Sequence, residues 1–316
     1  MNVSKTMNAN ESMIPKGANI HTGGGEDDYS DYIETSDVIM QYYKNQKTYG
    51  LDKYYIEIED WLKKKPEGDK NVPLLIEADE GVGKKTLIVQ WIHYHLSSSR
   101  KNYKDIVIPH FASAGGNNSN YFYALYRILT KLRELFNIKQ KVELLEEKIR
   151  KNFYYWLDLC SRKIKNNITF DGDIVIIIEG IEHFKDFDTG LESNLKFWLP
   201  RVFPDRVRFI ITVDHHSNSH KYLTGIGSEV IHMTVEKRLY FEMIQSMKAR
   251  PSFCTPDHHR RCYEAIETEY NNDEIDNTLY IKSFCSAFVP YETKNILSQN
   301  EIDDKLRKKI NLILSE

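Results

Sequence analysis

The residues best suited to chemistry lie in one loop, between an apolar segment at 72–76 and an amphipathic segment that begins near Leu87. The backbone N–H groups of such a loop, the N-terminus of the following helix and a lysine can converge on nucleotide phosphates. We therefore predict a phosphate-binding loop made of Ala78, Gly81, Val82, Gly83, Lys84, Lys85 and Thr86.

This loop departs from the usual pattern at its two ends. The pattern G-x-x-x-x-G-K-[ST] begins with glycine and ends with a hydroxyl that binds Mg²⁺. Here Ala78 takes the first position and Lys85 the last, with Thr86 one place further along. Sliding the pattern by one residue would put Lys84 at the tight glycine position, so we keep the first register. A glycine-containing turn in a domain that binds no nucleotide stays open as the alternative.

Two acidic residues form the second candidate group. Glu179 follows the apolar segment 174–178, where a metal–phosphate site places a carboxylate, usually Asp, for Mg²⁺ or its waters. We expect this strand to lie beside the strand that leads into the loop. Glu182 is the candidate to orient or deprotonate an attacking water. Thr212, near the end of the segment 207–213, is the candidate sensor of the terminal phosphate.

Two other groups of residues offer metal ligands. His215 and His216 are adjacent, and the segment 254–262 contains two cysteines and two histidines. The spacing in that segment is not that of a common zinc module, so we favour a turn that enters a helix. For the adjacent histidines, which suggest metal binding or acid–base work, we favour solvated loop residues.

These candidates need a sheet that brings strand ends together. Apolar segments that read as strands alternate with amphipathic helical segments, and this predicts a parallel, doubly wound α/β sheet. The segment 174–178 is uniformly apolar, as expected for a strand covered on both faces. The predicted strands are 72–76, 105–111, 174–178, 207–213 and 230–235.

Composition divides the chain into three parts. Residues 1–36 are poor in apolar periodicity and rich in Gly, Asn, Asp and Glu, so we expect a disordered acidic tail. The α/β core is expected at 37–235 and a helical lobe at 236–316. The last amphipathic run reaches the final residue without a cap signal, which suggests a chain truncated before further domains.

Charge and hydropathy argue against several classes of function. The net charge of −3 gives no broad attraction to nucleic acid or to an anionic membrane, so we expect neither as a partner. No apolar run approaches the roughly 18–20 residues of a membrane span. No signal peptide begins the sequence, and four scattered cysteines do not form a disulfide framework. We expect a cytoplasmic protein.

The chain resembles the nephrocystin-3-like STAND NTPases, whose nucleotide-binding domain is of the NACHT type. The resemblance implies a three-layer P-loop NTPase with a five-stranded parallel sheet of order 5-1-4-3-2, followed by a helical lobe. It also implies ATP or GTP and Mg²⁺ as ligands, protein partners of unknown identity, and a cytoplasmic or cilium-associated scaffold. The matching segments are 73–84, 107–111, 176–182, 198–204, 207–211, 220–223 and 230–233, in the family's order.

Three departures from the family's pattern bear on activity: Ala78 replaces Gly, Lys85 replaces Ser or Thr, and Glu179 replaces Asp. The change at Lys85 removes a metal ligand, and Mg²⁺ placement accounts for much of phosphoryl-transfer catalysis. We therefore expect a nucleotide-binding switch with a weakened Mg²⁺ site and slow or absent hydrolysis. The alternative is a degenerate NTPase fold that serves as an interaction module without nucleotide.

Overall fold

The computed structural model describes residues 26–46, 48, 50–64, 71–97, 105–167, 172–185 and 195–234. The helical lobe expected at 236–316, the first 25 residues of the expected tail and the Cys/His segment 254–262 lie outside these residues. Among the described helices, none is long and apolar enough to cross a membrane.

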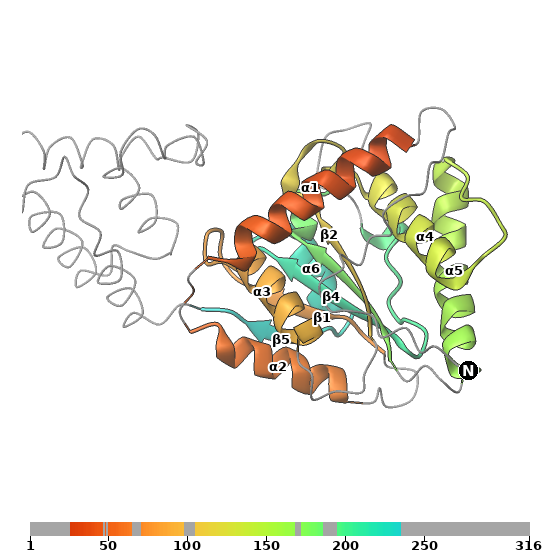
Figure 1. Cartoon of the computed structure of the whole chain (residues 1–316). Helices are drawn as coiled ribbons and strands as arrows, with labels where there is room; N and C mark the ends of the chain where they lie inside the picture. Colours follow the sequence, from red (N-terminus) through yellow and green to blue (C-terminus); the bar gives the residue numbers. More distant parts are fainter. Residues whose placement is uncertain are drawn as a thin grey trace, which may run out of the picture.

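A five-stranded parallel sheet forms the centre of the described part (Figure 1). Its strand order is β2-β3-β4-β1-β5, which confirms the expected order 5-1-4-3-2. All four strand pairs are parallel, so the carboxyl ends of the strands meet at one edge of the sheet. The strands are β1 (Leu74–Glu77), β2 (Ile106–Phe111), β3 (Ile174–Glu179), β4 (Val207–Val213) and β5 (Glu229–His232).

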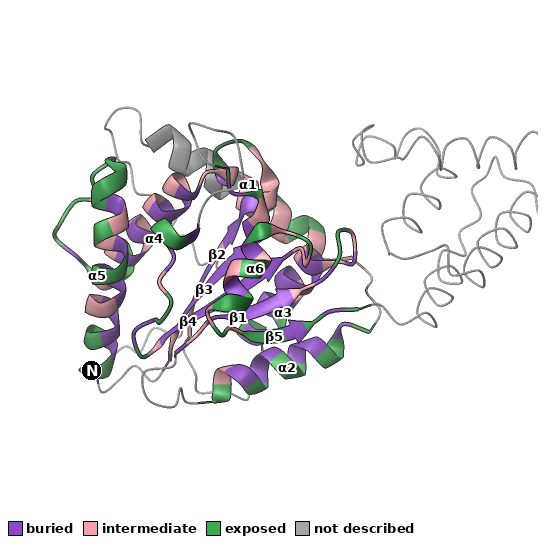
Figure 2. Cartoon of the chain, turned by 180° about the vertical axis from the view of Figure 1, so that it is seen from behind, coloured by how far each residue is buried: buried purple, intermediate pink, exposed green. Residues whose placement is uncertain are grey.

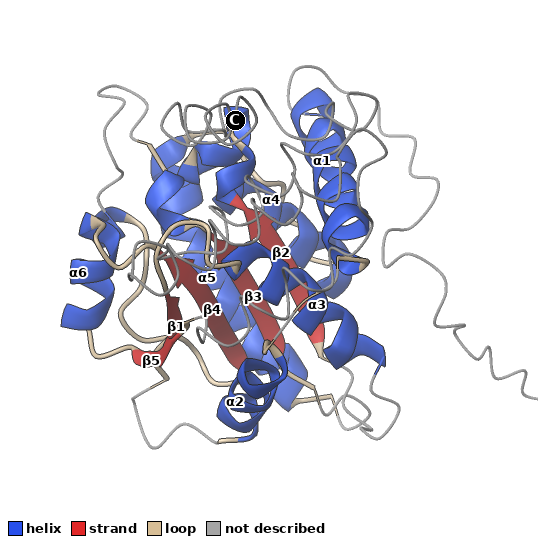
Figure 3. Ribbon diagram, turned by 90° about the vertical axis from the view of Figure 1, so that its left-hand side faces the viewer, coloured by secondary structure: helices blue, strands red, loops and turns tan. Residues whose placement is uncertain are grey.

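Helices lie on both sides of the sheet and give three layers (Figures 1 and 3). One side packs against α1 (Glu26–Lys44), α2 (Asp52–Lys63) and α3 (Lys84–Ser97). The other packs against α4 (Tyr121–Phe136), α5 (Glu146–Lys165) and α6 (Asn218–Gly225). Four short 3-10 helices join these elements: η1 (Ala112–Ala114), η2 (Gly116–Ser119), η3 (Ile181–His183) and η4 (Leu195–Phe197).

The uniformly apolar strands are buried on both faces, so each packs against both helical layers (Figure 2). Successive side chains of a strand point to opposite faces. Ile174, Ile176 and Ile178 accordingly pack into the cluster with α4 and α5, whereas Val175 and Ile177 pack with α2 and α3. All five are fully buried, as predicted from the apolar run. The fold is therefore the three-layer α/β fold of P-loop NTPases, with the loop after β1.

The N-terminal boundary differs from the expectation. Helix α1 begins at Glu26 and therefore includes residues 26–36, which we expected in the disordered tail. Three apolar side chains of the second half of this helix, Ile39, Met40 and Tyr43, pack on the core cluster. The polar first half gave no periodic signal, and the helix start was missed for that reason.

Gln90 of α3 ties the end of α1 to the helix that follows the loop. Its Nε2 donates to the carbonyl oxygens of Tyr43, at 3.1 Å, and Gln46, at 2.7 Å. Its Oε1 accepts hydrogen bonds from the hydroxyls of Thr48 and Tyr55. The side-chain amide thus satisfies backbone carbonyls at the end of α1, which a helix leaves unpaired.

A buried histidine, His95, joins two carboxylates near the start of β2, the edge strand of the sheet. His95 Nδ1 lies 2.6 Å from Oε1 of Glu59, and its Nε2 lies 3.0 Å from Oδ2 of Asp105. Trp91 Nε1 donates to the same Glu59 oxygen. Because buried carboxylates need partners, this bridge fixes α2, α3 and the entry to β2 together.

Arg208 has a structural role. Its side chain is buried within β4, its Nη2 donates to the carbonyl oxygen of Trp61 at 2.9 Å, and its guanidinium carbon lies 3.9 Å from the Trp61 ring centroid. The guanidinium therefore joins α2 to the sheet and lies within the structural core rather than at the loop.

Candidate phosphate-binding site

The loop between β1 and α3 has the backbone that a phosphate-binding loop needs. Gly81 and Gly83 have φ angles of 81° and 112°, a region that favours glycine. Helix α3 begins directly after Gly83, so its first N–H groups face the loop. A Cβ atom at Gly83 would lie 3.8 Å from Cε of Met233, which follows β5. The loop therefore rests on the chain that leaves the sheet.

Lys84 is the central charged group of the loop. Its side chain is 9% exposed, and its Nζ donates to the carbonyl oxygens of Ala78, at 2.8 Å, and Asp79, at 3.1 Å. The ammonium group thus lies inside the curve of the loop, with the N-terminus of α3 beside it. Both features favour an anion at this place.

The remaining loop residues divide between the core and α1. Ala78, Val82 and Thr86 are buried, and Ala78 and Val82 pack in the cluster that contains α3. Lys85 lies towards α1, where its Nζ is 5.6 Å from the centroid of the Tyr43 ring, within the range of a cation–π contact. The position that usually offers a hydroxyl to Mg²⁺ therefore carries an ammonium group near an aromatic ring.

Glu179 ends β3 and is buried among neighbouring strands. It accepts a hydrogen bond from the hydroxyl of Ser113, which lies in η1 after β2. We expected its strand to lie beside β1, and this was wrong, because β4 lies between β1 and β3. The carboxylate therefore faces the loop across one intervening strand, and Thr212 is the candidate residue on the adjacent strand.

Glu182 has an unusual environment for a carboxylate. Its side chain is only 14% exposed, and its Oε2 is buried without a hydrogen-bond partner among the described residues. Burial raises the pKa of Glu182 to about 7, although backbone hydrogen bonds and the charge of Lys84 oppose this rise. The neighbouring charge of Glu179 raises the pKa further. A carboxyl group with this pKa can give or take a proton near neutral pH.

Gly180 makes the turn that places both acids. Its φ angle is 70°, and an added Cβ would lie 2.8 Å from Cδ2 of His183 and 3.1 Å from Cβ of Ser113. Its N–H donates to Oγ1 of Thr212 at 2.8 Å. Thr212 is fully buried, so in this structure its hydroxyl braces the turn after β3.

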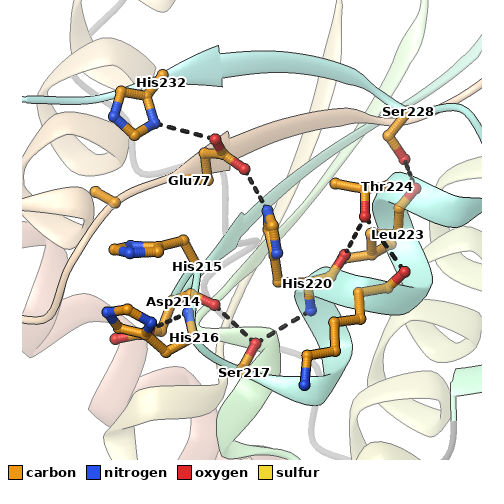
Figure 4. A network of polar contacts seen from close by, with 12 residues as sticks. Glu77, Asp214, His215, His216, Ser217, His220, Leu223, Thr224, Ser228 and His232 are labelled. Atoms are coloured by element: carbon orange, nitrogen blue, oxygen red, sulfur yellow. Dashed lines mark hydrogen bonds and ion pairs between the residues drawn. The ribbon is translucent and has the colours of Figure 1, made fainter.

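Sequence reasoning missed a histidine–carboxylate network at the ends of β1 and β5 (Figure 4). Glu77 accepts hydrogen bonds from Nε2 of His220 and, at 3.0 Å, from Nδ1 of His232. Burial alone would raise the pKa of Glu77, but these two histidines outweigh burial and lower it. His220 and His232 lie 143 and 155 positions after Glu77 in the chain, so no local sequence pattern predicted their contact.

The adjacent histidines after β4 also have a partner that the sequence did not suggest. Nδ1 of His215 lies 2.9 Å from Oδ1 of Asp79, and Nε2 of His216 lies 3.7 Å from the same oxygen. Asp79 belongs to the candidate phosphate-binding loop. The strand order β4-β1 makes this meeting possible, because it places the two strand ends side by side.

Comparisons with known sequences give distant relatives. Nephrocystin-3 of Xenopus laevis is 26% identical over 197 residues, which cover 60% of this chain and 14% of that protein. Nephrocystin-3 of Xenopus tropicalis is 27% identical over 166 residues, covering 52% and 11%. A TPR repeat-containing protein of Dictyostelium discoideum is 23% identical over 197 residues, covering 51% and 11%. The chain thus spans 14% or less of each relative, and no family model matches it.

Among solved structures, the chain is similar to ORC proteins. The ORC1 protein of Aeropyrum pernix, in complex with DNA, has a TM-score of 0.44 at 10% identity and covers 84% of this chain and 64% of its own. The ORC2 protein of the same organism, in ADPNP–ADP complexes, has a TM-score of 0.41 at 12% identity, covering 96% and 70%. Drosophila ORC bound to DNA has a TM-score of 0.43 at 9% identity, covering 96% and 83%. At these scores the similarities carry no argument about function. The site and the fold together describe a P-loop domain, similar in sequence to nephrocystin-3 over about half of the chain.

Proposed function

We propose that this chain binds ATP or GTP in the loop 78–86 and acts as a nucleotide-dependent switch or scaffold domain of the nephrocystin-3-like STAND type. The observation that carries the proposal is the position of Lys84, whose buried ammonium group lies on the loop carbonyls at the N-terminus of α3. A cation held there, in front of free helical N–H groups, suits a polyphosphate.

Binding needs a small change at Lys84. The ammonium group turns from the carbonyl oxygens of Ala78 and Asp79 to the outer phosphates, and the loop N–H groups then bind the inner ones. Gly81 and Gly83 allow the backbone to approach the phosphates without a side chain in the way. The similarity to nephrocystin-3 supports the switch or scaffold type, and the protein partners stay a prediction.

The acidic residues fit Mg²⁺ in part. Glu179 and Glu182 supply carboxylate oxygens, and the unpartnered Oε2 of Glu182 is a buried acceptor that a metal-bound water would satisfy. Position 85 supplies an ammonium group in place of the usual hydroxyl ligand. When bound, Mg²⁺ neutralises charge that develops on the phosphates. We propose that Glu179 holds the ion or its waters and that Lys85 weakens the site.

We propose that hydrolysis of the nucleotide in this site is slow or absent. Glu182, with a pKa of about 7, takes the proton of an attacking water. The hydroxyl of Thr212 is hydrogen-bonded to the N–H of Gly180, so it senses a terminal phosphate only if it leaves that contact. Weak placement of Mg²⁺ and the hydrogen-bonded hydroxyl of Thr212 both favour a site that binds nucleotide but hydrolyses it slowly.

Thermal unfolding with and without ligand tests binding. A ligand at about 100 times its Kd adds roughly 2.7 kcal/mol to the free energy of unfolding. For a domain of this size that shift corresponds to about 5–10 °C. ATP or GTP at millimolar concentration should raise the Tm of the full chain by this amount, and Mg²⁺ should add little.

Two variants make the test specific. Lys84→Ala should abolish the shift, whereas Lys141→Ala, which removes an exposed lysine away from the loop, should leave it unchanged. If neither ATP nor GTP shifts the Tm of the parent chain, the switch proposal is refuted. The alternative, a degenerate NTPase fold that serves as an interaction module without nucleotide, then takes its place.

A cytoplasmic or cilium-associated location and the expectation of no nucleic-acid partner belong to the same proposal. The net charge of −3 supports the second of these, because non-specific nucleic-acid binding needs clustered positive charge.

A further inference from the structure

We propose that Asp79, His215 and His216 form a binding site for a divalent transition-metal ion of the zinc class, beside the phosphate-binding loop. Each residue offers one ligand atom, and the three atoms lie within 4.8 Å of one another. This site is distinct from the Mg²⁺ site proposed at Glu179, since its ligands follow β1 and β4.

The distances between the ligand atoms suit such an ion. Zn²⁺ binds imidazole nitrogen and carboxylate oxygen at about 2.0–2.2 Å, so two tetrahedral ligand atoms lie about 3.4 Å apart. The two observed distances to Oδ1 of Asp79 are 2.9 Å for His215 and 3.7 Å for His216, on either side of that value. The side chain of His216 is 79% exposed, and its ring lies against that of His215, with the two centroids 3.8 Å apart.

The environment of His215 points to a missing partner. Its Nδ1 is buried and has no hydrogen-bond partner among the described residues, although Oδ1 of Asp79 is 2.9 Å away. The distance between these two atoms is that of a hydrogen bond, but their relative orientation is not. Buried polar atoms without a partner are rare in folded proteins and call for an explanation. An ion between the two atoms supplies one, because both lone pairs can then point to it.

The turn that carries the histidines is held in place by its own hydrogen bonds (Figure 4). Oδ1 of Asp214 accepts from the N–H of His216 at 2.8 Å, and the carbonyl oxygen of Asp214 accepts from the hydroxyl of Ser217 at 2.7 Å. Ser217 then caps α6 by accepting from the N–H of His220 at 3.1 Å. A turn fixed between β4 and α6 loses little freedom when its side chains bind an ion.

The chemistry of the ligand set selects the class of ion. Imidazole nitrogen suits Zn²⁺, Cu²⁺, Ni²⁺ and Co²⁺, whereas Mg²⁺ prefers oxygen ligands and keeps its waters. Two imidazoles, one carboxylate and a water molecule complete a tetrahedral site of the open type. The nearby Glu77 does not belong to it, because His220 and His232 already occupy its two oxygens.

Such an ion would join two parts of the domain that meet at the loop. Asp79 also gives its carbonyl oxygen to Nζ of Lys84. An ion on its carboxylate would therefore fix the loop to the turn after β4 and restrict the movement of the residues around Lys84.

Metal titration of the full chain tests the proposal without nucleotide. Chain stripped of metal with a chelator is titrated with Co²⁺, followed by absorption spectroscopy, and Zn²⁺ is then added to displace the Co²⁺. We expect one equivalent of Co²⁺ with visible ligand-field bands, and no sulfur-to-cobalt charge-transfer band, since no thiolate is in the ligand set.

Three variants separate this site from others in the chain. The double variant His215→Ala/His216→Ala should lower the affinity for Co²⁺ and Zn²⁺ by at least about tenfold, as removal of metal-site groups typically does. Asp79→Asn should weaken binding as well. The matched control Cys254→Ser/Cys262→Ser, which removes the other possible ligand group, should leave the affinity unchanged.

Tryptophan fluorescence confirms that each variant remains folded. Equal Zn²⁺ affinity in the parent and the double histidine variant would overturn the proposal. Loss of binding in the cysteine variant alone, or no binding at micromolar Zn²⁺, would overturn it too. Since no nucleotide is present, the result is independent of the function proposed above.

Discussion

Substitution of Glu182 by Gln should make the domain more stable at alkaline pH, contrary to the usual effect of changing a buried residue. Gln has nearly the same shape as Glu and stays neutral. The charge that the parent protein is forced to bury above neutral pH is therefore removed, while the packing of η3 is kept.

The structure sets the size of the effect. Burial moves the pKa of Glu182 from 4.5 to about 7, and a difference of this size corresponds to about 3 kcal/mol. Between these two pH values the unfolded chain binds fewer protons than the folded one, so the free energy of unfolding falls as pH rises. The stability of the parent is complete below pH 4.5 and is reduced by this amount above pH 7.

Urea unfolding measured by tryptophan fluorescence suits this test. The chain has four tryptophans, and all are buried in the described core: Trp61, Trp91, Trp156 and Trp198. At pH 5 the parent and Glu182→Gln should unfold at similar urea concentrations. At pH 8.5 the variant should have the higher free energy of unfolding, by up to about 3 kcal/mol.

Glu57→Gln is the matched control, because Glu57 is exposed on α2 and should show no such pH-dependent difference. If the difference between Glu182→Gln and the parent is the same at pH 5 and pH 8.5, the assigned environment of Glu182 is incorrect. A difference that grows with pH in the control as well would point to the whole charge balance of the chain instead.

Three further substitutions probe the loop, the turn and the core. Lys85→Thr restores the usual hydroxyl, so Mg²⁺-dependent turnover should rise well above the parent's in a phosphate-release assay; unchanged turnover would count against a weakened metal site. Gly180→Ala forces a side chain into a left-handed position against His183 and should lower the free energy of unfolding by about 1–3 kcal/mol in urea titrations, with an unaltered midpoint speaking against the strain. His95→Leu removes the imidazole that joins the Glu59 and Asp105 carboxylates and should lower the free energy of unfolding by about 3–5 kcal/mol at neutral pH; a loss below about 1 kcal/mol would show that the bridge adds little.

The sheet was predictable because its strands are apolar on both faces. An uninterrupted run such as 174–178, which is short and consists of β-branched residues, is typical of a buried strand, and the alternation with amphipathic helices implies parallel pairing. The strand order came from the family resemblance, and the observed pairing of the strands confirms it. The start of α1 was missed because residues 26–36 are mostly polar, so hydrophobic periodicity carried no information there.

The candidate site was predictable only where its residues are close in sequence. The loop 78–86 has a local pattern, and Glu179 and Glu182 follow a recognisable strand. Ser113 and the Glu77 network depend on which strand ends are neighbours in the sheet, which no local spacing encodes. The contact between Asp79 and His215 also depends on which strand ends are neighbours. The raised pKa of Glu182 could not be predicted either, since its burial depends on how the residues around the carboxyl ends of the strands pack.

The contacts of Met233 and Thr234 give the domain a way to pass a change in its loop to the rest of the chain. A Cβ atom added at Gly83 would lie 3.8 Å from Cε of Met233, which is van der Waals contact. The next residue, Thr234, is held through its N–H and carbonyl oxygen by the hydroxyl of Tyr54, at 2.8 and 2.7 Å. Thr234 is therefore anchored to α2, one residue after the residue that lies next to the loop. A ligand that displaces Gly83 would therefore move Met233 against an anchored neighbour, so that a change in the loop reaches the last described residues of the domain.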